Sequence, residues 1–368
     1  MKVRFVNPQR TYKNLKKELD GAYFSVMKKG AFIAQSEFAL FETQFAHFVG
    51  TKYAVGLSSG YDALYLSLIA SNIGHGDEVI VPAHTFVATA SAVVNTGATP
   101  ILVDVRDDFN INPFLIEKVI TKKTKAIIPV HLNGRMADMN PIVKIAKNNK
   151  LMVIEDACQS LGATYRGKPA GSIGLTGCWS FYPFKMLGGY GDGGAITTNN
   201  KKVADTIRLL RFNGEDRNTG EYHYYGCSSL LDNMQAAFLS VKIKYLPEWI
   251  EKRRDIAKRY HDGLADIDGL ILPHFSQKGF SDVYQNYIIQ SNSGTKFSDY
   301  LQSHGIEVLT QFRTPYYRHK GLRLAKNDFP VTDQLSKEVC SLPIYPELKD
   351  KEIDYVIRVI RSFTTQLK

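Results

Sequence analysis

The chain has 368 residues, 44% of them hydrophobic, and a formal net charge of +10 at pH 7. This length and apolar content suffice for a large core, most simply divided between two domains. No stretch approaches the roughly 20 continuous apolar residues of a membrane span, and the N-terminus lacks the apolar run of a signal peptide. The four cysteines form no CxxC pair, so we expect buried, reduced thiols in a cytoplasmic protein.

The positive charge does not indicate a nucleic-acid partner. No basic block alternates with aromatic residues, and no nucleic-acid-binding motif is present. No metal site is expected either. A solvated basic surface is the simplest interpretation, although a basic cleft would also attract an anionic cofactor and anionic substrates.

Short apolar runs alternate with helical patterns through the first part of the chain. The predicted strands cover residues 53–58, 78–82, 99–104, 124–130, 151–155, 177–182 and 194–198. Alternation of this kind predicts a mostly parallel sheet with helices on both faces. Asn112 before Pro113 and Asn140 before Pro141 predict two helix starts, each with asparagine as the N-cap and proline at the first helical position.

The pattern changes near Pro247. A long charged helix is predicted over residues 248–264, and a shorter helix over 297–304 should end at Gly305. Strands are predicted over 283–290 and 306–312, and a last amphipathic helix should begin near Lys351. We therefore expect a large α/β domain over residues 1–247 and a small α+β domain over residues 248–368.

Two polar residues follow predicted buried strands and open into loops. Asp156 follows the predicted strand 151–155, whose first four residues are apolar, and Lys185 lies in the glycine-rich segment 180–194. A lysine becomes a covalent catalyst when it forms a Schiff base with an aldehyde cofactor. Pyridoxal 5′-phosphate is such a cofactor, and it also needs a carboxylate facing its pyridinium nitrogen. The simpler alternative is that Asp156 caps a helix that follows it.

A phosphate site is indicated upstream of this pair. A strand-like run ends at Gly60, where a helical pattern begins, and free backbone amides at a helix start bind phosphate well. The segment Gly189–Gly194 matches the dinucleotide pattern GxGxxG. Because a β-type sequence follows it instead of a helix, we do not assign a dinucleotide site there.

Phosphate turn, carboxylate and lysine occur in an order that resembles the sugar aminotransferase family of fold-type I pyridoxal-phosphate enzymes (the DegT/StrS type). The resemblance extends over nearly the whole chain. The matching stretches are Phe41-Glu42, Phe45-Ala46, residues 50–55, Ser59-Gly60, residues 62–64, 85–89, 129–132, 155–157, 180–194 and 341–346.

The resemblance implies roles for individual residues. Lys185 would bind the cofactor covalently and move the proton between cofactor and substrate carbons, and Asp156 would pair with the pyridinium nitrogen. The other implied contacts are Phe86 on the ring face, Gln159 on the phenolic oxygen, and Gly60, Tyr61 and Ser180 at the phosphate.

The resemblance also implies an architecture and an assembly. The strand near 194–198 should run antiparallel to its neighbours in the fold-type I sheet. The protein should be a two-fold homodimer whose active sites are shared, with Ser228 reaching the cofactor phosphate of the neighbouring subunit.

Three local departures from the family pattern concern the substrate. Tyr61 stands where the family usually has threonine, and Ser228 and Leu230 replace an Asn-x-Arg pattern. Residues 310–319 replace the family's His-Tyr-Pro-x-Pro-x-His segment. Within that segment, the candidates for contact with an anionic group are Arg313, Arg318 and His319.

We therefore expect a pyridoxal-phosphate-dependent aminotransferase that moves an amino group from L-glutamate to a keto-sugar, with pyridoxamine 5′-phosphate as the amino-carrying form of the cofactor. The leading substrate is a nucleotide-linked keto-deoxysugar, in amino-sugar biosynthesis for surface polysaccharide or a related glycoconjugate. One alternative substrate is a keto-sugar or phosphorylated ketone without a nucleotide. A different class is a non-catalytic binding or regulatory relative, which would have little reason to retain Lys185. Lys185 also argues against the family's dehydratase branch, which has histidine there.

Overall fold

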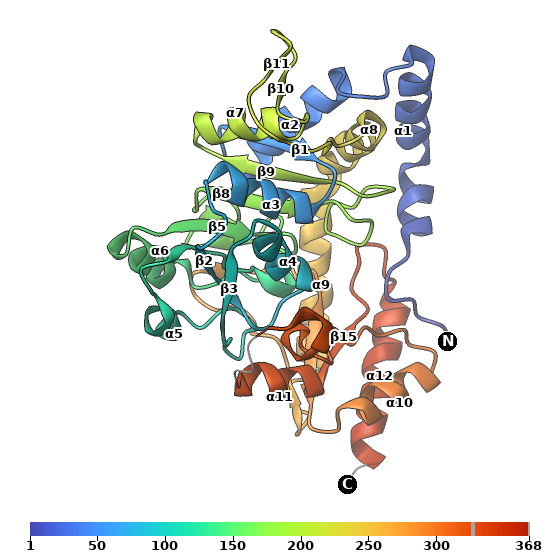
Figure 1. Ribbon diagram of the computed structural model, residues 1–368. Helices are drawn as coiled ribbons and strands as arrows, with labels where there is room; N and C mark the ends of the chain where they lie inside the picture. The colour runs from blue at the N-terminus through green and yellow to red at the C-terminus, as the bar shows by residue number, and fades with distance from the viewer. Residues whose placement is uncertain (325–327, 367–368) are drawn as a thin grey trace.

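A seven-stranded sheet with the order β1-β9-β8-β5-β4-β2-β3 forms the centre of the molecule (Figure 1). The computed structural model describes residues 1–324 and 328–366. The strands of this sheet are β1 (Tyr53–Leu57), β2 (Glu78–Pro82), β3 (Thr99–Val103), β4 (Thr124–Ile127), β5 (Met152–Asp156), β8 (Thr176–Ser180) and β9 (Gly194–Thr198). Each overlaps a segment predicted as a strand, so the predicted α/β sheet is confirmed.

The strand directions bring three carboxyl ends to one edge of the sheet. The pairs between β8, β5, β4, β2 and β3 are parallel, whereas β9 runs antiparallel to both β1 and β8, as expected. Gly194 at the start of β9 lies opposite Leu57 at the end of β1 and opposite Ser180 at the end of β8. The ends of β1, β5 and β8 therefore meet where ligands bind in open α/β sheets.

Helices cover both faces of the sheet, as the alternating pattern predicts. They are α1 (Pro8–Lys29), α2 (Ser36–Val49), α3 (Gly60–Ala70), α4 (Val87–Asn95), α5 (Pro113–Ile116), α6 (Met139–Asn148), α7 (Lys201–Leu210) and α8 (Asn233–Lys242). Successive residues of a strand point to opposite faces. In β5, Val153 packs in the layer that contains α2, α6 and α8, and Ile154 packs in the layer of α3, α4 and α7.

One of the two predicted helix starts is confirmed and the other is wrong. Asn112 caps α5, because its side-chain oxygen accepts a hydrogen bond from the Phe114 amide at 3.1 Å. Asn140 is not a cap, because α6 begins at Met139, two residues before the predicted start at Pro141, with Asp138 in the cap position. Pro141 is tolerated inside the first turn because the amides there have no partner within the helix.

The C-terminal part contains a second, smaller sheet. Its helices and strands are α9 (Leu246–Leu264), β12 (Leu270–Ile271), β14 (Tyr287–Ser291), α10 (Thr295–Ser303), α11 (Pro330–Glu338), β15 (Val339–Leu342) and α12 (Asp350–Gln366). The three predicted helices are confirmed, and Gly305 follows α10 with a positive φ of 76°. The predicted strand over 283–290 begins only at Tyr287, and β15 was not predicted.

The strand predicted over residues 306–312 is wrong. Single bridges join Ile306 to Val3 and Leu309 to Ser341, and no continuous pairing develops between them. Each bridge has a different partner segment, and Phe312 takes a positive φ of 56° that turns the chain away. This segment, although its composition is typical of a strand, therefore forms no continuous strand pairing.

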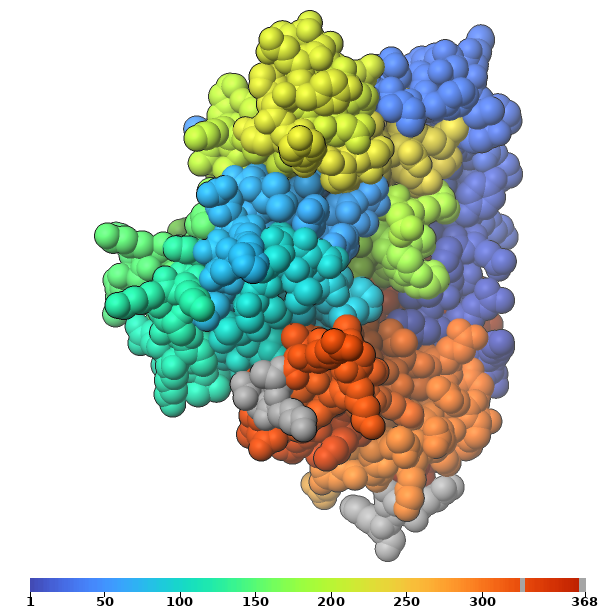
Figure 2. Space-filling model, viewed as in Figure 1, coloured from blue at the N-terminus to red at the C-terminus, as the bar shows by residue number. Residues whose placement is uncertain are grey.

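Short elements complete the fold. They are β6 (Thr164–Tyr165), β7 (Lys168–Pro169), β10 (Glu215–Asp216), β11 (Glu221–Tyr222), β13 (Phe280–Ser281), and the 3-10 turns Glu117–Val119, Leu132–Gly134, Ile243–Tyr245, Tyr316–Arg318 and Lys320–Leu322. The hairpin β10–β11 projects from one end of the molecule (Figures 1 and 2).

The C-terminal part packs directly on the central sheet, and Figure 2 shows the two as one continuous body. Tyr316, Tyr317 and Phe329 belong to the hydrophobic cluster of α3 and α4, and the Tyr316 hydroxyl donates to the Pro82 carbonyl at 3.0 Å. From the end of β3, the buried Asp104 carboxylate accepts hydrogen bonds from the first amides of α11. These contacts fix the C-terminal part against the strand ends that form the site.

Within the described ranges, no helix is long and apolar enough to cross a membrane. The cysteines are free thiols, as expected, but only Cys178 and Cys340 are buried, whereas Cys158 and Cys227 are partly buried.

Candidate active site

A cavity of about 520 Å³ opens at the carboxyl ends of β1, β5 and β8. It collects every residue to which the sequence analysis gave a cofactor role, except Ser228. These lining residues are Gly60, Tyr61, Phe86, Asp156, Gln159, Ser180 and Lys185. Residues far apart in sequence therefore form one site.

The start of α3 presents free backbone amides to this cavity. Ser59 caps the helix, because its hydroxyl accepts from the Asp62 amide at 3.0 Å and its carbonyl accepts from the Ala63 amide at 3.1 Å. The amides of Gly60 and Tyr61 remain for a ligand, at the positive end of the helix dipole. A Cβ on Gly60 would lie 2.8 Å from the Ser180 Cβ, so the close approach of β8 requires glycine.

The Tyr61 side chain is turned away from a phosphate contact. Its hydroxyl accepts a hydrogen bond from Asn95 Nδ2 at 2.7 Å, and its ring stacks on Tyr65 with a centroid distance of 6.1 Å. Its available contribution to an anion is the backbone amide, as expected where tyrosine replaces threonine.

Asp156 presents a buried carboxylate with 6% exposure. One oxygen accepts from Thr89 Oγ1 at 2.9 Å and the other from the Cys158 amide at 3.3 Å. Turns follow Asp156 instead of a helix, so the alternative that it is a helix cap is wrong. Among the described residues no cation forms an ion pair with Asp156, and a buried carboxylate of this kind favours a positively charged ligand.

The amide of Gln159 has a defined orientation. Its oxygen accepts from the Asn133 backbone amide at 2.9 Å and from Asn286 Nδ2 at 3.4 Å. Asn286, from the C-terminal part, also donates to the Asn133 side-chain oxygen at 3.1 Å. Because the oxygen is used, the NH₂ group of Gln159 is left as the donor for an oxygen atom in the cavity. No local motif indicated Asn133 or Asn286.

Lys185 lies in a loop whose backbone is held on several sides. Its own amide donates to the Tyr182 carbonyl at 2.9 Å, and Gln285 Nε2 donates to the Phe184 carbonyl at 2.8 Å. Burial raises the pKa of the Cys158 thiol well above its usual value, the charge of Asp156 raises it further, and the charge of Lys185 partly opposes this. Lys185 and Cys158 both line the cavity. The strand β9 follows directly after Gly193, so GxGxxG here is not a dinucleotide motif.

Ser228 lies outside the cavity of its own chain. It forms a single bridge with Phe212 and is exposed. The neighbouring Ser229 is buried and donates to Asp62 Oδ2 at 2.8 Å. Because successive residues of an extended segment point in opposite directions, Ser228 is directed away from the start of α3. Its contribution to a partner's site stays a prediction.

Several lining residues were not assigned roles from the sequence. They are Thr85, Thr89, Cys158, Tyr182, Asp192, Gln311 and Phe312. Thr85 and Thr89 lie in a stretch that matched the family, whereas Gln311 and Phe312 lie in the segment that departs from it. The candidate anion contacts Arg313, Arg318 and His319 do not line the cavity, since Arg313 donates to Ser298 Oγ and Arg318 pairs with Asp333.

A buried histidine supports the wall beside Phe86. His84 is 2% exposed, and its ring lies between Phe109 and Phe312 at centroid distances of 5.6 and 5.4 Å. Its Nδ1 atom has no hydrogen-bond partner within the described residues. Burial lowers the pKa of His84 to about 4, and the charge of Asp104 only partly opposes this effect.

The donor set fits pyridoxal 5′-phosphate. A helix start can bind the phosphate, a buried carboxylate can face a protonated ring nitrogen, an amide donor can reach a phenolic oxygen, and a lysine lies beside them. In the part of the chain that the structure describes, no group of His, Cys, Asp and Glu is placed to hold a metal ion.

The fold and the site define a pyridoxal-phosphate-dependent enzyme of the α/β class. The chain belongs to the DegT/DnrJ/EryC1/StrS aminotransferase family, whose family model matches residues 13–361. It is therefore an aminotransferase, as the resemblance implied.

Relatives cover nearly the whole chain. A "Pleiotropic regulatory protein" of Geobacillus stearothermophilus is 38% identical over 99% of each chain. A dTDP-3-amino-3,4,6-trideoxy-alpha-D-glucose transaminase of Streptomyces venezuelae is 36% identical over 100% of this chain and 97% of its own. Other relatives at 36–38% identity are named as transaminases of dTDP- or UDP-linked sugars.

Solved structures share the fold. DesV of S. venezuelae, in complex with a ketimine intermediate, has a TM-score of 0.95 and 36% identity, covering 99% of this chain and 98% of that chain. NtdA of Bacillus subtilis, with bound cofactor PMP, has a TM-score of 0.92 and 31% identity, covering 99% of this chain and 86% of that chain.

The burial of His84 predicts an acid-sensitive fold. Between the ordinary histidine pKa and the folded value near 4, the unfolded state binds a proton that the folded state does not. The free energy of unfolding therefore decreases as the pH is lowered through this range. We expect His84→Leu to remove roughly 2–3 kcal/mol of the loss in unfolding free energy between pH 7.5 and 4.5. Urea unfolding at several pH values measures this slope. The exposed His319→Leu is the control, and an unchanged slope in His84→Leu would contradict the assignment.

Proposed function

We propose that this protein moves an amino group from L-glutamate to a nucleotide-linked keto-deoxysugar, in amino-sugar biosynthesis for surface polysaccharide or a related glycoconjugate. The observation that carries the proposal is the convergence of Lys185, Asp156 and the start of α3 on one cavity. The names of relatives that act on dTDP- and UDP-linked sugars support the substrate class.

Each residue of the cavity has a distinct task in this proposal. Bound pyridoxal 5′-phosphate supplies an aldehyde that takes up an amino group and a ring that withdraws electrons. The Lys185 amine takes and returns the proton at the carbons beside the transferred nitrogen. Asp156, oriented by Thr89, keeps a ring nitrogen protonated through its negative charge. The Gly60 and Tyr61 amides hold the phosphate, together with Ser180.

A regulatory protein without turnover is the alternative class. The name of the Geobacillus stearothermophilus relative points in that direction. Lys185, lining the cavity beside an oriented Asp156, favours catalysis. A protein that only binds its ligand needs no amine to move a proton.

The assignment of Lys185 and Asp156 predicts specific losses. Borohydride should fix the cofactor to Lys185, and Lys185→Ala should lose turnover because its amine moves the proton. Asp156→Asn should keep the fold but raise the activation free energy by more than the ~1–2 kcal/mol of an ordinary hydrogen bond. The reason is that a neutral amide does not hold the ring nitrogen protonated. Mass spectrometry of the reduced, digested protein and initial rates measure both effects, with exposed Lys202→Ala as the control. A label on another lysine, or near-normal turnover of Asp156→Asn, would refute these roles.

A homodimer with shared active sites is part of the proposal. Large apolar side chains are exposed on α1, on α2 and between them: Phe24 at 65%, Phe32 at 50% and Leu40 at 52%. Figure 1 places α2 and the β10–β11 hairpin, which precedes Ser228, at one end of the molecule, with α1 running down one side from that end. Exposed apolar surface of this kind supports a subunit contact.

The free cysteines support a reducing, cytoplasmic location for the protein.

Subunit mixing tests whether sites are shared. Ser228→Glu would place a negative charge against the partner's phosphate, so that variant and Lys185→Ala should each be inactive alone. A mixed dimer contains one site with both residues intact, so refolding an equal mixture should restore about a quarter of the wild-type rate. Hybrid dimers that form but remain inactive would show that Ser228 and Lys185 do not meet across the interface. Ser228→Ala serves as the mild control.

Competition by free nucleotides tests the substrate class. A site for a nucleotide-linked sugar should bind dTDP or UDP, so either nucleotide should inhibit competitively against the sugar substrate, while inorganic phosphate at equal concentration should not. Lack of inhibition by both nucleotides at millimolar concentration would favour the keto-sugar or phosphorylated ketone without a nucleotide. Gln311 and Phe312 line the cavity in the altered segment and are the residues to vary next.

A further inference from the structure

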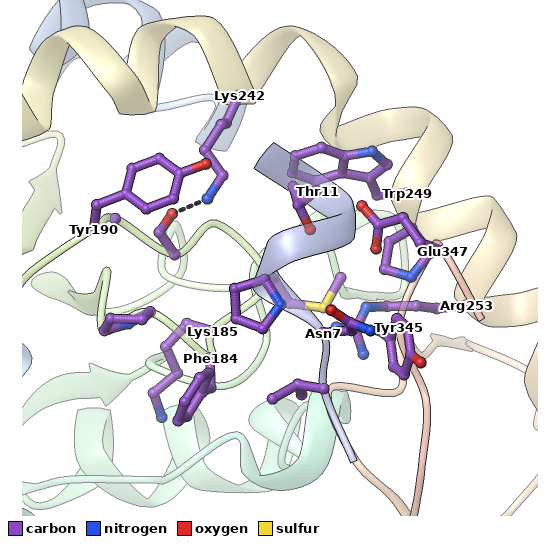
Figure 3. A pocket seen from close by; sticks show the side chains of 17 residues that line it. Asn7, Thr11, Phe184, Lys185, Tyr190, Lys242, Trp249, Arg253, Tyr345 and Glu347 are labelled. Carbon is purple, nitrogen blue, oxygen red and sulfur yellow. Dashed lines mark hydrogen bonds between the residues drawn. The ribbon is translucent and has the colours of Figure 1, made fainter. Parts of the chain in front are cut away.

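A second cavity, of about 80 Å³, lies behind the loop that carries Lys185 (Figure 3). The N-terminal segment, the loop 183–190, the helices α8 and α9, and residues 345–347 enclose it. Lys185 borders both this cavity and the active-site cavity. Two further cationic side chains line it, Lys242 and Arg253, with 6% and 5% exposure.

Helix α8 holds the Lys185 loop with two side chains on one face. Gln235 and Lys242 lie two helical turns apart and therefore point to the same side. Gln235 Oε1 accepts from the Tyr190 amide at 2.8 Å. Lys242 Nζ donates to the Gly188 carbonyl and lies 4.7 Å from the centre of the Tyr190 ring. Figure 3 shows this hydrogen bond and the tyrosine ring beside it.

The position of Gly188 is transmitted to Lys185 through the backbone. The loop turns back on itself, because the Gly189 amide donates to the Phe181 carbonyl at 2.7 Å. Gly188 packs against the Pro183 carbonyl so closely that a Cβ would clash with it. A shift of the Gly188 carbonyl therefore displaces residues 183–185.

The charges around Lys242 make its burial costly. Among the described residues, it forms no ion pair, and the nearby Glu347 carboxylate attracts it only from beyond contact distance. Burial lowers the pKa of Lys242 to about 8, with Glu347 opposing. Arg253 is itself a cation, and it donates to the Tyr284 and Ile344 carbonyls. Burial raises the pKa of Tyr190 to about 12, so its hydroxyl stays uncharged near neutral pH. Neither side chain therefore neutralises Lys242.

A side chain that only filled this space would be more stable without a charge. We propose that Lys242 is a positioning residue for Lys185. The ammonium group of Lys242 holds the Gly188 carbonyl and the Tyr190 ring, and thereby directs Lys185 into the active-site cavity. This inference rests on the proposed role of Lys185. Charge-assisted hydrogen bonds and cation–π contacts both depend on the proton. The loop is therefore held firmly below pH 8 and less firmly above it.

The affinity for pyridoxal 5′-phosphate tests the proposal. We expect Lys242→Met to weaken binding about tenfold at pH 7, the value of one lost hydrogen bond to a charged group. The ratio of the two dissociation constants should fall towards one above pH 9, where wild-type Lys242 is itself neutral. Titration of the apoprotein, followed by absorbance between pH 6.5 and 9.5, gives this ratio. Taking the ratio cancels the titration of groups common to both proteins.

Two variants and one structural readout complete the test. Gln235→Met should loosen the same loop without making the ratio depend on pH, and the exposed Lys244→Met should match wild type. In apoprotein at pH 7, Lys242→Met should accelerate hydrogen exchange of the loop amides while the midpoint of thermal unfolding stays unchanged or rises. A lowered midpoint with unchanged cofactor affinity, or a ratio independent of pH, would overturn the proposal. Borohydride labelling separates this failure from failure of the proposed function, which would leave Lys185 unlabelled in wild type.

Discussion

One buried carboxylate, that of Glu155, holds together the chain segments around the site. It is fully buried and accepts from the amides of Gly171, Ile173 and Gly174 at 3.0, 2.7 and 2.6 Å. His131 lies 2.9 Å away, and since its Nδ1 accepts from the Ala137 amide, its Nε2 donates to Glu155. The end of β5 is thereby tied to the segment after β4 and to the loop before β8. Because neighbouring residues of a strand face opposite sides, fixing Glu155 inward also fixes Asp156 toward the cavity.

The C-terminal part completes the site instead of merely adjoining it. Gln285 holds the carbonyl of the residue before Lys185, and Asn286 holds the amide of Gln159. Both are buried residues in the turn before β14, so one short segment positions groups on two sides of the cofactor pocket. A displacement of the C-terminal part would therefore move the Lys185 loop and the Gln159 side chain together.

The sequence predicted those features that have a local or periodic cause. Strands buried on both faces are continuous apolar runs, and parallel strands collect their ligands at one edge, so Asp156 and the start of α3 could be placed together before the fold was known. Residues whose role depends on distant partners left no such mark. Asn286 and Lys242 each act on a loop far away in sequence, and the failed strand at 306–312 has its two bridges to unrelated segments. The Asn140 prediction failed for a smaller reason, a shift of two residues in the helix start.

The contact between Asp104 and α11 has a consequence for the order of folding. The residue before α11, Phe329, supplies no side-chain cap, and both first amides bind the carboxylate of Asp104 instead. A side-chain cap is worth about 1 kcal/mol, and this one comes from the end of β3, which is synthesised long before α11. The helix therefore gains its cap only on a sheet that has already formed. During synthesis, the end of β3 must therefore be in place before the start of α11 can be stabilised in this way.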